Sequence, residues 1–390
     1  MAGAAWSYST NGLPLCHSDV ANSDQKTADI NRLNIIHIAG TKGKGGTCAY
    51  IECLLRAHGR RTGFPAKTGL YTSPHLISPE ERIRIDFRPL DKEVFARYVS
   101  ETQEALQSSA GDTQDAPRYL QFLALVSFHA FIKEGVDVAI YETHQGGEYD
   151  ATNVIPKPIV TAITPIDEDH MHQLGPSLEN VAWHKAGIFK ASAPAFSAPQ
   201  QNAVATVLQK RAADKGVTLE FVEVCSDLPA DAPQLKPEVQ LLNFSLARAV
   251  SNSFLRQRAP QGNAMLSSLD IIQGLQAFSW PGRFQSISDG NLAWFLDGAH
   301  NKLSLGICAR WFAQTSSNME RNMTGSLISN DMLMPNSSVC QVLIFGHYSS
   351  HRDQVALLKS LVDSLLQHHI SIQHVIFTTC QYTRSASNGP

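Results

Sequence analysis

The sequence contains no long run of lysine and arginine, and its formal net charge at pH 7 is only −3. This absence excludes the basic footprint of a general nucleic-acid binder. Nor is there an uninterrupted run of about 18 apolar residues, the length that a membrane-spanning helix requires. We therefore expect a protein that binds neither nucleic acid nor membrane, and any phosphate recognition should be confined to a local site.

Paired cysteine motifs are also missing. The seven cysteines stand at positions 16, 48, 53, 225, 308, 340 and 380, without a CxxC pair. An odd, scattered set suits reduced thiols better than a disulfide or zinc framework. Residues 1–15 lack the positively charged segment and apolar run of a secretory signal. We expect a cytoplasmic protein, with a mitochondrial form as the alternative although no transit peptide is evident.

What the chain does have is globular composition, with 43% hydrophobic and 17% charged residues over 390 positions. That length accommodates about two or three domains. Residues 1–30 are polar and aperiodic, which predicts a flexible arm. The segment Trp280-Pro-Gly282 interrupts the periodic pattern. We place a boundary near residue 288, which gives domains at 31–288 and 289–390.

Apolar runs alternate with helical patterns along both predicted domains. Strands are expected at 34–39, 136–142, 158–166, 219–224, 292–297, 341–345 and 374–378. Helices are expected at 47–58, 91–107, 119–133, 178–189, 201–215, 240–256, 269–277, 302–314 and 352–367, with a surface insertion at 315–338. This alternation predicts an α/β protein with a parallel, doubly wound sheet.

A glycine-rich segment follows the first expected strand and precedes a helix, where backbone N–H groups and the helix dipole converge on an anion. Its residues, all candidates for nucleotide binding, are Gly40, Thr41, Lys42, Gly43, Lys44, Gly45, Gly46 and Thr47. Lys44 is expected to neutralise the β- and γ-phosphates. The strict P-loop spacing fails, because Ile38 replaces the first glycine and Gly45 follows Lys44. A glycine-rich turn is the alternative on this pattern alone.

Further motifs follow in order along residues 34–380. They are Lys67-Thr-Gly-Leu-Tyr-Thr-Ser-Pro-His75, Glu81-Arg-Ile-Arg84, Asp150-Ala-Thr-Asn153, Asp169-His170, Lys185-Ala-Gly-Ile188, Pro281-Gly-Arg283 and Leu296-Asp-Gly-Ala-His300. Together with the glycine-rich loop they resemble folylpolyglutamate synthases, which are Mur-ligase-type, ATP-dependent amide ligases. The resemblance implies an N-terminal P-loop domain and a smaller, Rossmann-like C-terminal domain.

The resemblance also implies cofactors, substrates and site residues. ATP and Mg²⁺ would be the cofactors, and folate and glutamate the substrates of a monomeric enzyme. Catalysis would involve Lys44, Glu142, His170, Lys185 and His300. The implied metal ligands are Ser73, Glu142, His170 and Lys185, the last as a carbamate. Thr72, Pro74 and His75 would lie at the substrate, and Arg283 and Asp297 at the nucleotide.

Glu142 closes the apolar strand Val-Asp-Val-Ala-Ile-Tyr-Glu, so it should lie at the carboxyl edge of the sheet, where doubly wound folds collect ligands. For the other residues plain structural roles stay open. A Ser-Pro step can be a turn, an Asp-His pair can cap a helix, Lys185 can be an ordinary cationic helix residue, and Arg283 can be a solvated linker charge.

The chain departs from the family pattern at the phosphate loop and after Glu142. Gly46 replaces a serine, which puts the magnesium geometry in doubt unless Thr47 compensates. Gln145 replaces a glycine and Glu148 an arginine, so we expect a reversed local field that would repel a carboxylate-rich substrate. Two alternatives to a folate ligase therefore stay open. One is a ligase for another acid and amine, and the other is a homologue that no longer turns over ATP and works as a binding protein or a non-ligase enzyme.

Overall fold

The computed structural model describes residues 29–109, 116–168, 171–228, 232–327, 339–346 and 353–378. Almost all of the expected N-terminal arm and the last part of the expected insertion lie outside these ranges. The chain divides into two compact units, Met1–Trp280 (unit 1) and Pro281–Pro390 (unit 2). The division lies before the expected boundary at residue 288, within the Trp-Pro-Gly segment. The functional domains assigned to 31–288 and 289–390 stay a prediction.

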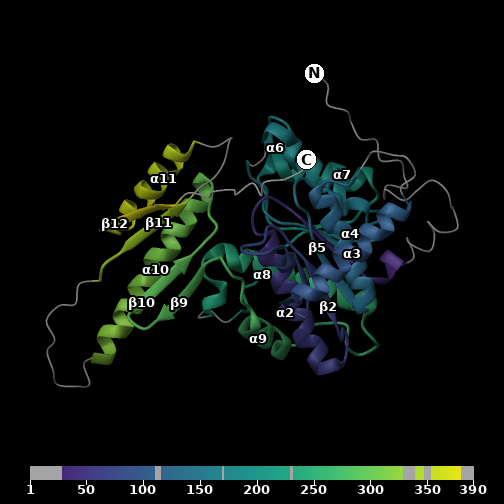
Figure 1. Cartoon of the computed structure of the whole chain (residues 1–390), viewed down its shortest axis with the longest axis horizontal. Helices are drawn as coiled ribbons and strands as arrows, with labels where there is room; N and C mark the ends of the chain where they lie inside the picture. The colour runs from purple at the N-terminus through teal and green to yellow at the C-terminus, as the bar shows by residue number, and fades with distance from the viewer. Residues whose placement is uncertain are drawn as a thin grey trace, which may run out of the picture. The chain divides into compact units, whose positions relative to one another are not determined.

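Unit 1 is built on an eight-stranded sheet with the order β4-β3-β2-β5-β1-β6-β7-β8 (Figure 1). Its strands are β1 Ile36–Ala39, β2 Thr68–Tyr71, β3 Ile83–Ile85, β4 Arg88–Pro89, β5 Val138–Glu142, β6 Val160–Ile163, β7 Ala195–Ser197 and β8 Leu219–Phe221. In sheet order, the five pairs from β2 to β8 are parallel, and the two pairs at the other edge, β2–β3 and β3–β4, are antiparallel. The predicted α/β class with a largely parallel sheet is confirmed.

The central strands form from short apolar runs because a parallel sheet is covered on both faces. Every residue of β1, β5 and β6 is buried. The expected strand at 219–224 contains β8, whereas the prediction missed β2, β3, β4 and β7. β2 reads Thr-Gly-Leu-Tyr, and so short and mixed a run carries no strand signal of its own.

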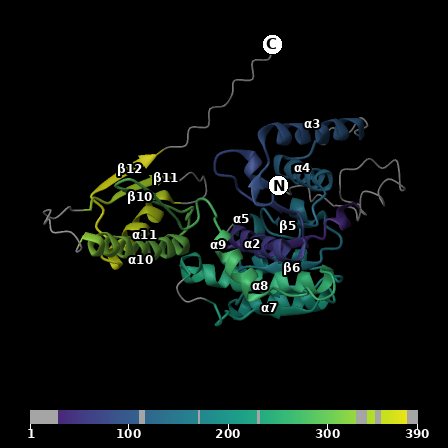
Figure 2. The same ribbon diagram turned by 90° about the horizontal axis from the view of Figure 1, so that it is seen from below.

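Helices cover both faces of this sheet. They are α2 Lys44–Thr62, α3 Lys92–Ser109, α4 Tyr119–Glu134, α5 Met171–Leu174, α6 Leu178–Lys185, α7 Asn202–Asp214, α8 Glu238–Arg258 and α9 Ser268–Ala277. Figure 2 shows α3 and α4 on one side of β5, with α2 and α8 on the other. Separate hydrophobic clusters fill the α2–α8 side, the α3–α4 side, and the space where α6 and α7 pack on β6 and β7.

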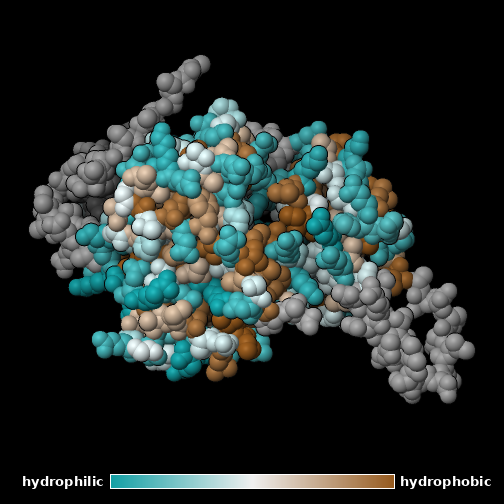
Figure 3. Space-filling view, turned by 180° about the vertical axis from the view of Figure 1, so that it is seen from behind, coloured by the Kyte–Doolittle hydropathy of each residue, from teal (hydrophilic) through white to brown (hydrophobic). Residues whose placement is uncertain are grey.

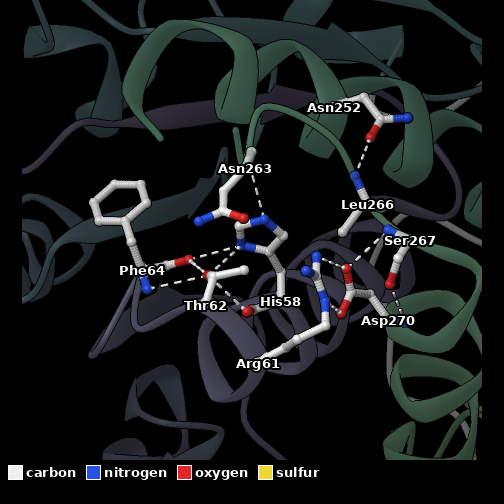
Figure 4. Close-up of polar contacts among 9 residues, drawn as sticks. All are labelled: His58, Arg61, Thr62, Phe64, Asn252, Asn263, Leu266, Ser267 and Asp270. Atoms are coloured by element: carbon white, nitrogen blue, oxygen red, sulfur yellow. Dashed lines mark hydrogen bonds and ion pairs between the residues drawn. The ribbon is translucent and has the colours of Figure 1, made fainter. Parts of the chain in front are cut away.

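Helix α2 extends beyond the expected 47–58 at both ends and continues through Gly59. Gly59 serves for close approach, because a Cβ there would collide with the carbonyl oxygen of Pro65. Near this end, Arg61 forms two hydrogen bonds with Asp270 of α9, at 2.8 and 2.7 Å. His58 lies between the carbonyl oxygens of Phe64 and Asn263 (Figure 4). These contacts attach α9 to the far end of the helix that begins at the phosphate loop.

Unit 2 contains β9 Gln285–Asp289, β10 Leu292–Leu296, α10 Lys302–Leu327, β11 Val342–Gly346, α11 Gln354–Gln367 and β12 His374–Thr378. The strands form an antiparallel pair, β9–β10, and a parallel pair, β11–β12. The expected insertion at 315–338 is wrong in its first part, where α10 continues to Leu327. Serine and asparagine suggested a loop there, but the helix already packing through Leu305, Ala309 and Trp311 extends across them.

Several large apolar side chains of unit 2 are exposed by 40 to 64%: Ile287, Leu292, Trp294, Leu296, Val342, Ile344, Val375, Ile376 and Phe377. Hydrophobic and hydrophilic side chains are mixed over the face of the molecule in Figure 3. Among the described helices, none has both the length and the apolar character needed to span a membrane.

Candidate active site

The glycine-rich loop joins β1 to the first turn of α2, as the sequence predicts. Gly43 precedes the helix with a φ of 84°, a left-handed conformation that glycine adopts readily. The N–H groups of Thr41 and Lys42 donate to the carbonyl oxygen of Pro165 at 3.0 and 3.2 Å. The N–H groups of Thr41 and Lys42 thus have acceptors within the protein, whereas the first-turn N–H groups of α2, which begins at Lys44, have no partner within the helix.

Lys44 and Glu142 come together across the carboxyl ends of β1 and β5. Lys44 Nζ lies 3.9 Å from Glu142 Oε1. The other oxygen, Oε2, accepts hydrogen bonds from Thr72 Oγ1 at 2.5 Å and from the Ser73 N–H at 3.1 Å. Glu142 is only 3% exposed. Segments about 30 to 100 residues apart in the chain thus hold one carboxylate with Oε1 directed towards the lysine of the phosphate loop.

Thr72 and His75, both expected at the substrate, already have protein partners. Thr72 is buried and directs its hydroxyl to Glu142, so in this structure it orients the carboxylate. His75 Nδ1 accepts a hydrogen bond from Arg82 Nε at 2.8 Å. Burial and the neighbouring Arg82 lower the pKa of His75, which keeps its imidazole neutral. Pro74 is exposed between them.

Lys185 is buried at the end of α6 and reaches the phosphate loop. Its Nζ donates to the carbonyl oxygen of Gly40 at 2.6 Å, and the residue is 4% exposed. An ordinary cationic residue of α6 accounts for this contact, and the metal-binding carbamate stays a prediction. His170, the remaining expected metal ligand, lies outside the described residues.

Gly46 replaces the serine of the family pattern, and Thr47 is the residue that could compensate for it; both have close neighbours in the structure. A Cβ at Gly46 would meet Asn243 Nδ2 at 3.3 Å and Gln240 Oε1 at 3.4 Å, both on α8. Thr47 donates its N–H to the Gly43 carbonyl oxygen at 2.8 Å, and its hydroxyl is buried without a partner. Because α2 begins at Lys44, Thr47 is inside the helix and does not take the place of the missing hydroxyl at position 46.

Glu148 does not reverse the field as expected, because α7 supplies cations to it. Glu148 Oε2 pairs with Arg211 NH2 at 2.5 Å and lies 3.5 Å from Lys215 Nζ. Arg211 is also stacked 4.3 Å from the centroid of the Trp183 ring. The sequence could not reveal these partners, which lie more than sixty residues away.

A buried polar chain fixes the loop that follows Glu142. His144 Nε2 lies 2.6 Å from the Tyr71 hydroxyl and its Nδ1 lies 3.4 Å from Asp150 Oδ1. Thr152 Oγ1 links Asp150, at 2.7 Å, to His37 Nε2 on β1, at 2.8 Å. Burial alone would raise the pKa of Asp150, but its interactions with His144 and with backbone N–H groups hold it at about 2. Asp150 of the predicted Asp-Ala-Thr-Asn motif is thus a buried anchor.

Arg283, Asp297 and His300 gather within unit 2. Asp297 Oδ2 accepts the Phe284 N–H at 2.9 Å, and burial raises the pKa of this carboxyl. His300 Nδ1 lies 2.8 Å from the Gly298 carbonyl oxygen, which can only accept, so this nitrogen donates the hydrogen bond. The Arg283 guanidinium packs against Gly298. The structure therefore brings these three residues together and separately brings Lys44, Glu142, Ser73 and Lys185 together.

A surface pocket of about 480 Å³ lies apart from the phosphate loop, lined by Lys157, Phe189, Lys190 and Lys215 among others. Lys215 ends α7 and donates to the Gly187 carbonyl oxygen at 2.8 Å. Lysines at helix carboxyl ends complement the helix dipole, which explains this residue structurally. The chemistry instead collects at the carboxyl ends of β1, β2 and β5.

Comparisons with known proteins agree with the fold. No family model matches the chain. The crystal structure of the apo form of L. casei folylpolyglutamate synthase superposes with a TM-score of 0.70 at 24% identity, covering 90% of this chain and 82% of that one. A folylpolyglutamate synthase complex with AMPPCP and folate superposes with a TM-score of 0.68 at 24% identity, covering 90% and 83%. At this identity the likeness establishes the Mur-ligase-type fold.

Curated relatives found by sequence have a higher identity to this chain than these two solved structures. Folylpolyglutamate synthase of Neurospora crassa is 42% identical over 304 residues, which cover 76% of this chain and 57% of the relative. The mitochondrial human enzyme is 36% identical, covering 88% and 59%. The probable folylpolyglutamate synthase of Schizosaccharomyces pombe is 37% identical over 369 residues, covering 93% and 70%. The chain thus spans 57 to 70% of the length of these relatives, and at such identity over so much of both sequences it belongs to the folylpolyglutamate synthase family.

Proposed function

We propose that this protein is an ATP- and Mg²⁺-dependent ligase that adds glutamate to folates through an amide bond. The observation that carries the proposal is the convergence of Lys44, Glu142, Thr72 and Ser73 at the carboxyl ends of adjacent strands. Its relatives are named folylpolyglutamate synthases, and one solved neighbour binds AMPPCP and folate.

The reaction requires activation, because a carboxylate does not react with an amine unless its oxygen becomes a leaving group. Transfer of the γ-phosphoryl group to the folate carboxylate gives an acyl phosphate and ADP. The glutamate amine then attacks the acyl carbon, the bond from this carbon to the phosphate oxygen breaks, and phosphate leaves with the proton that the amine nitrogen loses. Lys44 and the N–H groups of the first turn of α2 would stabilise the phosphate charge throughout. No protein general base is needed if the amine arrives deprotonated.

Two described residues fit a magnesium ion. Glu142 Oε1 accepts no hydrogen bond from a described residue, and the Ser73 hydroxyl is carried by the residue whose N–H orients the same carboxylate. Carboxylate and hydroxyl oxygens suit this ion, which keeps several waters and phosphate oxygens. When bound, it would neutralise the developing phosphate charge. We propose His170 as a further ligand.

Lys185 as an ammonium does not fit a cation site, and in the structure it donates to Gly40 instead. Carbamylation would convert it into an oxygen ligand for a second magnesium, and it would replace this hydrogen bond. We propose the carbamate for the loaded enzyme, with the unmodified amine bracing the phosphate loop otherwise.

The remaining assignments follow the same proposal. Arg283 would bind phosphates, Asp297 the ribose or adenine, and His300 would lie near the reacting groups. Thr72, Pro74 and His75 would border the folate site. We propose a cytoplasmic monomer. The pairing of Glu148 with Arg211 and Lys215 removes one of the two reasons for a non-folate substrate or a loss of ATP turnover, and Gly46 is the other.

The test measures phosphate released from ATP by the full chain with tetrahydrofolate, glutamate and Mg²⁺. We expect release to depend on both substrates and Lys44→Ala to lower its rate by about 100-fold or more, because a preorganised positive charge is lost. Lys67→Ala is the matched control, since Lys67 pairs with Glu134 away from the loop and its loss should leave the rate unchanged. No release and no AMPPCP binding by the unaltered chain would refute the proposal.

A further inference from the structure

Trp280 is the last residue of unit 1 and lies beside the phosphate loop. It is not among the site residues that the sequence predicts. A Cβ at Gly45 would stand 3.2 Å from Trp280 Nε1 and 3.3 Å from Glu142 Oε2. The indole nitrogen and the carboxylate therefore border the same glycine in the first turn of α2. Any side chain at position 45 would crowd both groups.

The indole ring is held in place from its face. The Arg84 guanidinium carbon lies 4.8 Å from the ring centroid, and the Phe87 ring centroid lies 6.0 Å away. Arg84 is itself buried, with Nε donating to the Glu81 carbonyl oxygen at 3.1 Å. A cation stacked on an indole attracts it electrostatically, so the ring is oriented before any ligand arrives.

The indole N–H is a donor only, and it has no hydrogen-bond acceptor among the residues that the structure describes. The nearby Glu142 Oε2 already accepts hydrogen bonds from Thr72 and Ser73. The first-turn N–H groups of α2 are donors, and the Lys44 ammonium, a cation, lies 3.9 Å from Glu142 Oε1. An anionic acceptor would complete this arrangement.

We propose that the Trp280 indole N–H donates a hydrogen bond to a phosphate oxygen of the nucleotide at the first turn of α2. The inference rests on the proposed ATP-dependent function and adds a binding residue to it. Trp280 directly precedes the Pro281-Gly-Arg283 motif in the sequence.

The experiment compares the full chain with Trp280→Phe, which keeps the ring under Arg84 but removes the N–H. Calorimetry with AMPPCP and Mg²⁺ should show about tenfold weaker binding, the loss expected for one hydrogen bond to a charged acceptor. The melting temperature without nucleotide should not change. Trp183→Phe is the matched control, because that indole stacks on Arg211, and its affinity should equal that of the unaltered chain.

A second readout follows the indole directly. The indole N–H resonance that disappears in Trp280→Phe should shift in the unaltered chain when AMPPCP is added. If the chain binds AMPPCP while Trp280→Phe binds it equally well and this resonance does not move, the inference is wrong and the proposed function stands. If Lys44→Ala and the unaltered chain both fail to bind, the proposed function and the inference fall together. A lower melting temperature of nucleotide-free Trp280→Phe would show a structural role and overturn the inference.

Discussion

Glu52, in the middle of α2, carries a fully buried carboxyl group whose two oxygens differ in their hydrogen-bond partners. Its Oε1 accepts hydrogen bonds from Thr68 Oγ1 at 2.7 Å and from the Phe87 N–H at 2.8 Å. Its Oε2 is buried without a partner. Burial raises the pKa of Glu52 to about 7, since the hydrogen bonds and the nearby arginines offset desolvation only in part. A proton on this group therefore favours the folded state.

This residue should make unit 1 less stable as pH rises. Between the unfolded pKa of 4.5 and the folded pKa of about 7, the folded state binds more protons, so the free energy of unfolding falls by about 3 kcal/mol in total. The free energy of unfolding of Glu52→Gln should lack this pH dependence, because an amide does not titrate. The substitution should also lower this free energy by an amount that is the same at every pH, because the new amide needs an acceptor. Urea unfolding at pH 4.5, 6 and 8 measures the difference. A constant difference between variant and unaltered chain across these pH values would contradict the prediction.

At the scale of elements, α2 links the phosphate loop to the rest of unit 1. One end carries Lys44, and the other is fastened to α9 by Arg61 and Asp270 (Figure 4). Asp270 also accepts the Ser267 N–H at 2.8 Å, which caps α9. A single buried carboxylate thus fixes both the start of α9 and its position on α2.

Asp270→Asn should lower the free energy of unfolding by about 2 kcal/mol, because the buried pair loses its charge while Arg61 still reaches solvent. The control is Asp227→Asn, because the Asp227 side chain, which pairs with the part-buried Arg248, is 63% exposed. We expect a loss of less than about 1 kcal/mol there. Denaturant unfolding measures both, and equal losses would show that burial does not distinguish the two pairs.

At the scale of the whole molecule, the two units differ in how much core they possess. Unit 1 has three hydrophobic clusters around its sheet. The cluster described in unit 2 has five buried members, from α10, α11 and the turn after α11. Stability grows with the apolar area removed from water, so the units should differ in stability.

We expect unit 2 to unfold at a lower urea concentration than unit 1. Hydrogen exchange followed by mass spectrometry, on peptides from α10 and α11 and from α2 and β5, reports each unit separately. Protection should disappear first in the peptides of unit 2. Loss of protection in all four elements at one urea concentration would show that the chain unfolds as one cooperative body.

The sequence by itself determined the features that depend on neighbouring residues. Apolar runs predict β1, β5 and β6 because buried parallel strands are apolar throughout, and glycines before Lys44 predict the phosphate loop because the backbone must turn there. The ordered motifs also identified the family, since the loop and Glu142 keep their places along the chain.

Tertiary structure decided which distant groups meet. Thr72 orients Glu142, Arg211 pairs with Glu148, and the Trp280 indole borders Gly45, each across at least sixty residues of chain. No local pattern encodes such contacts, because they depend on strand order and helix packing. The sequence therefore predicted which residues form the candidate site, and the fold decided which partners those residues have.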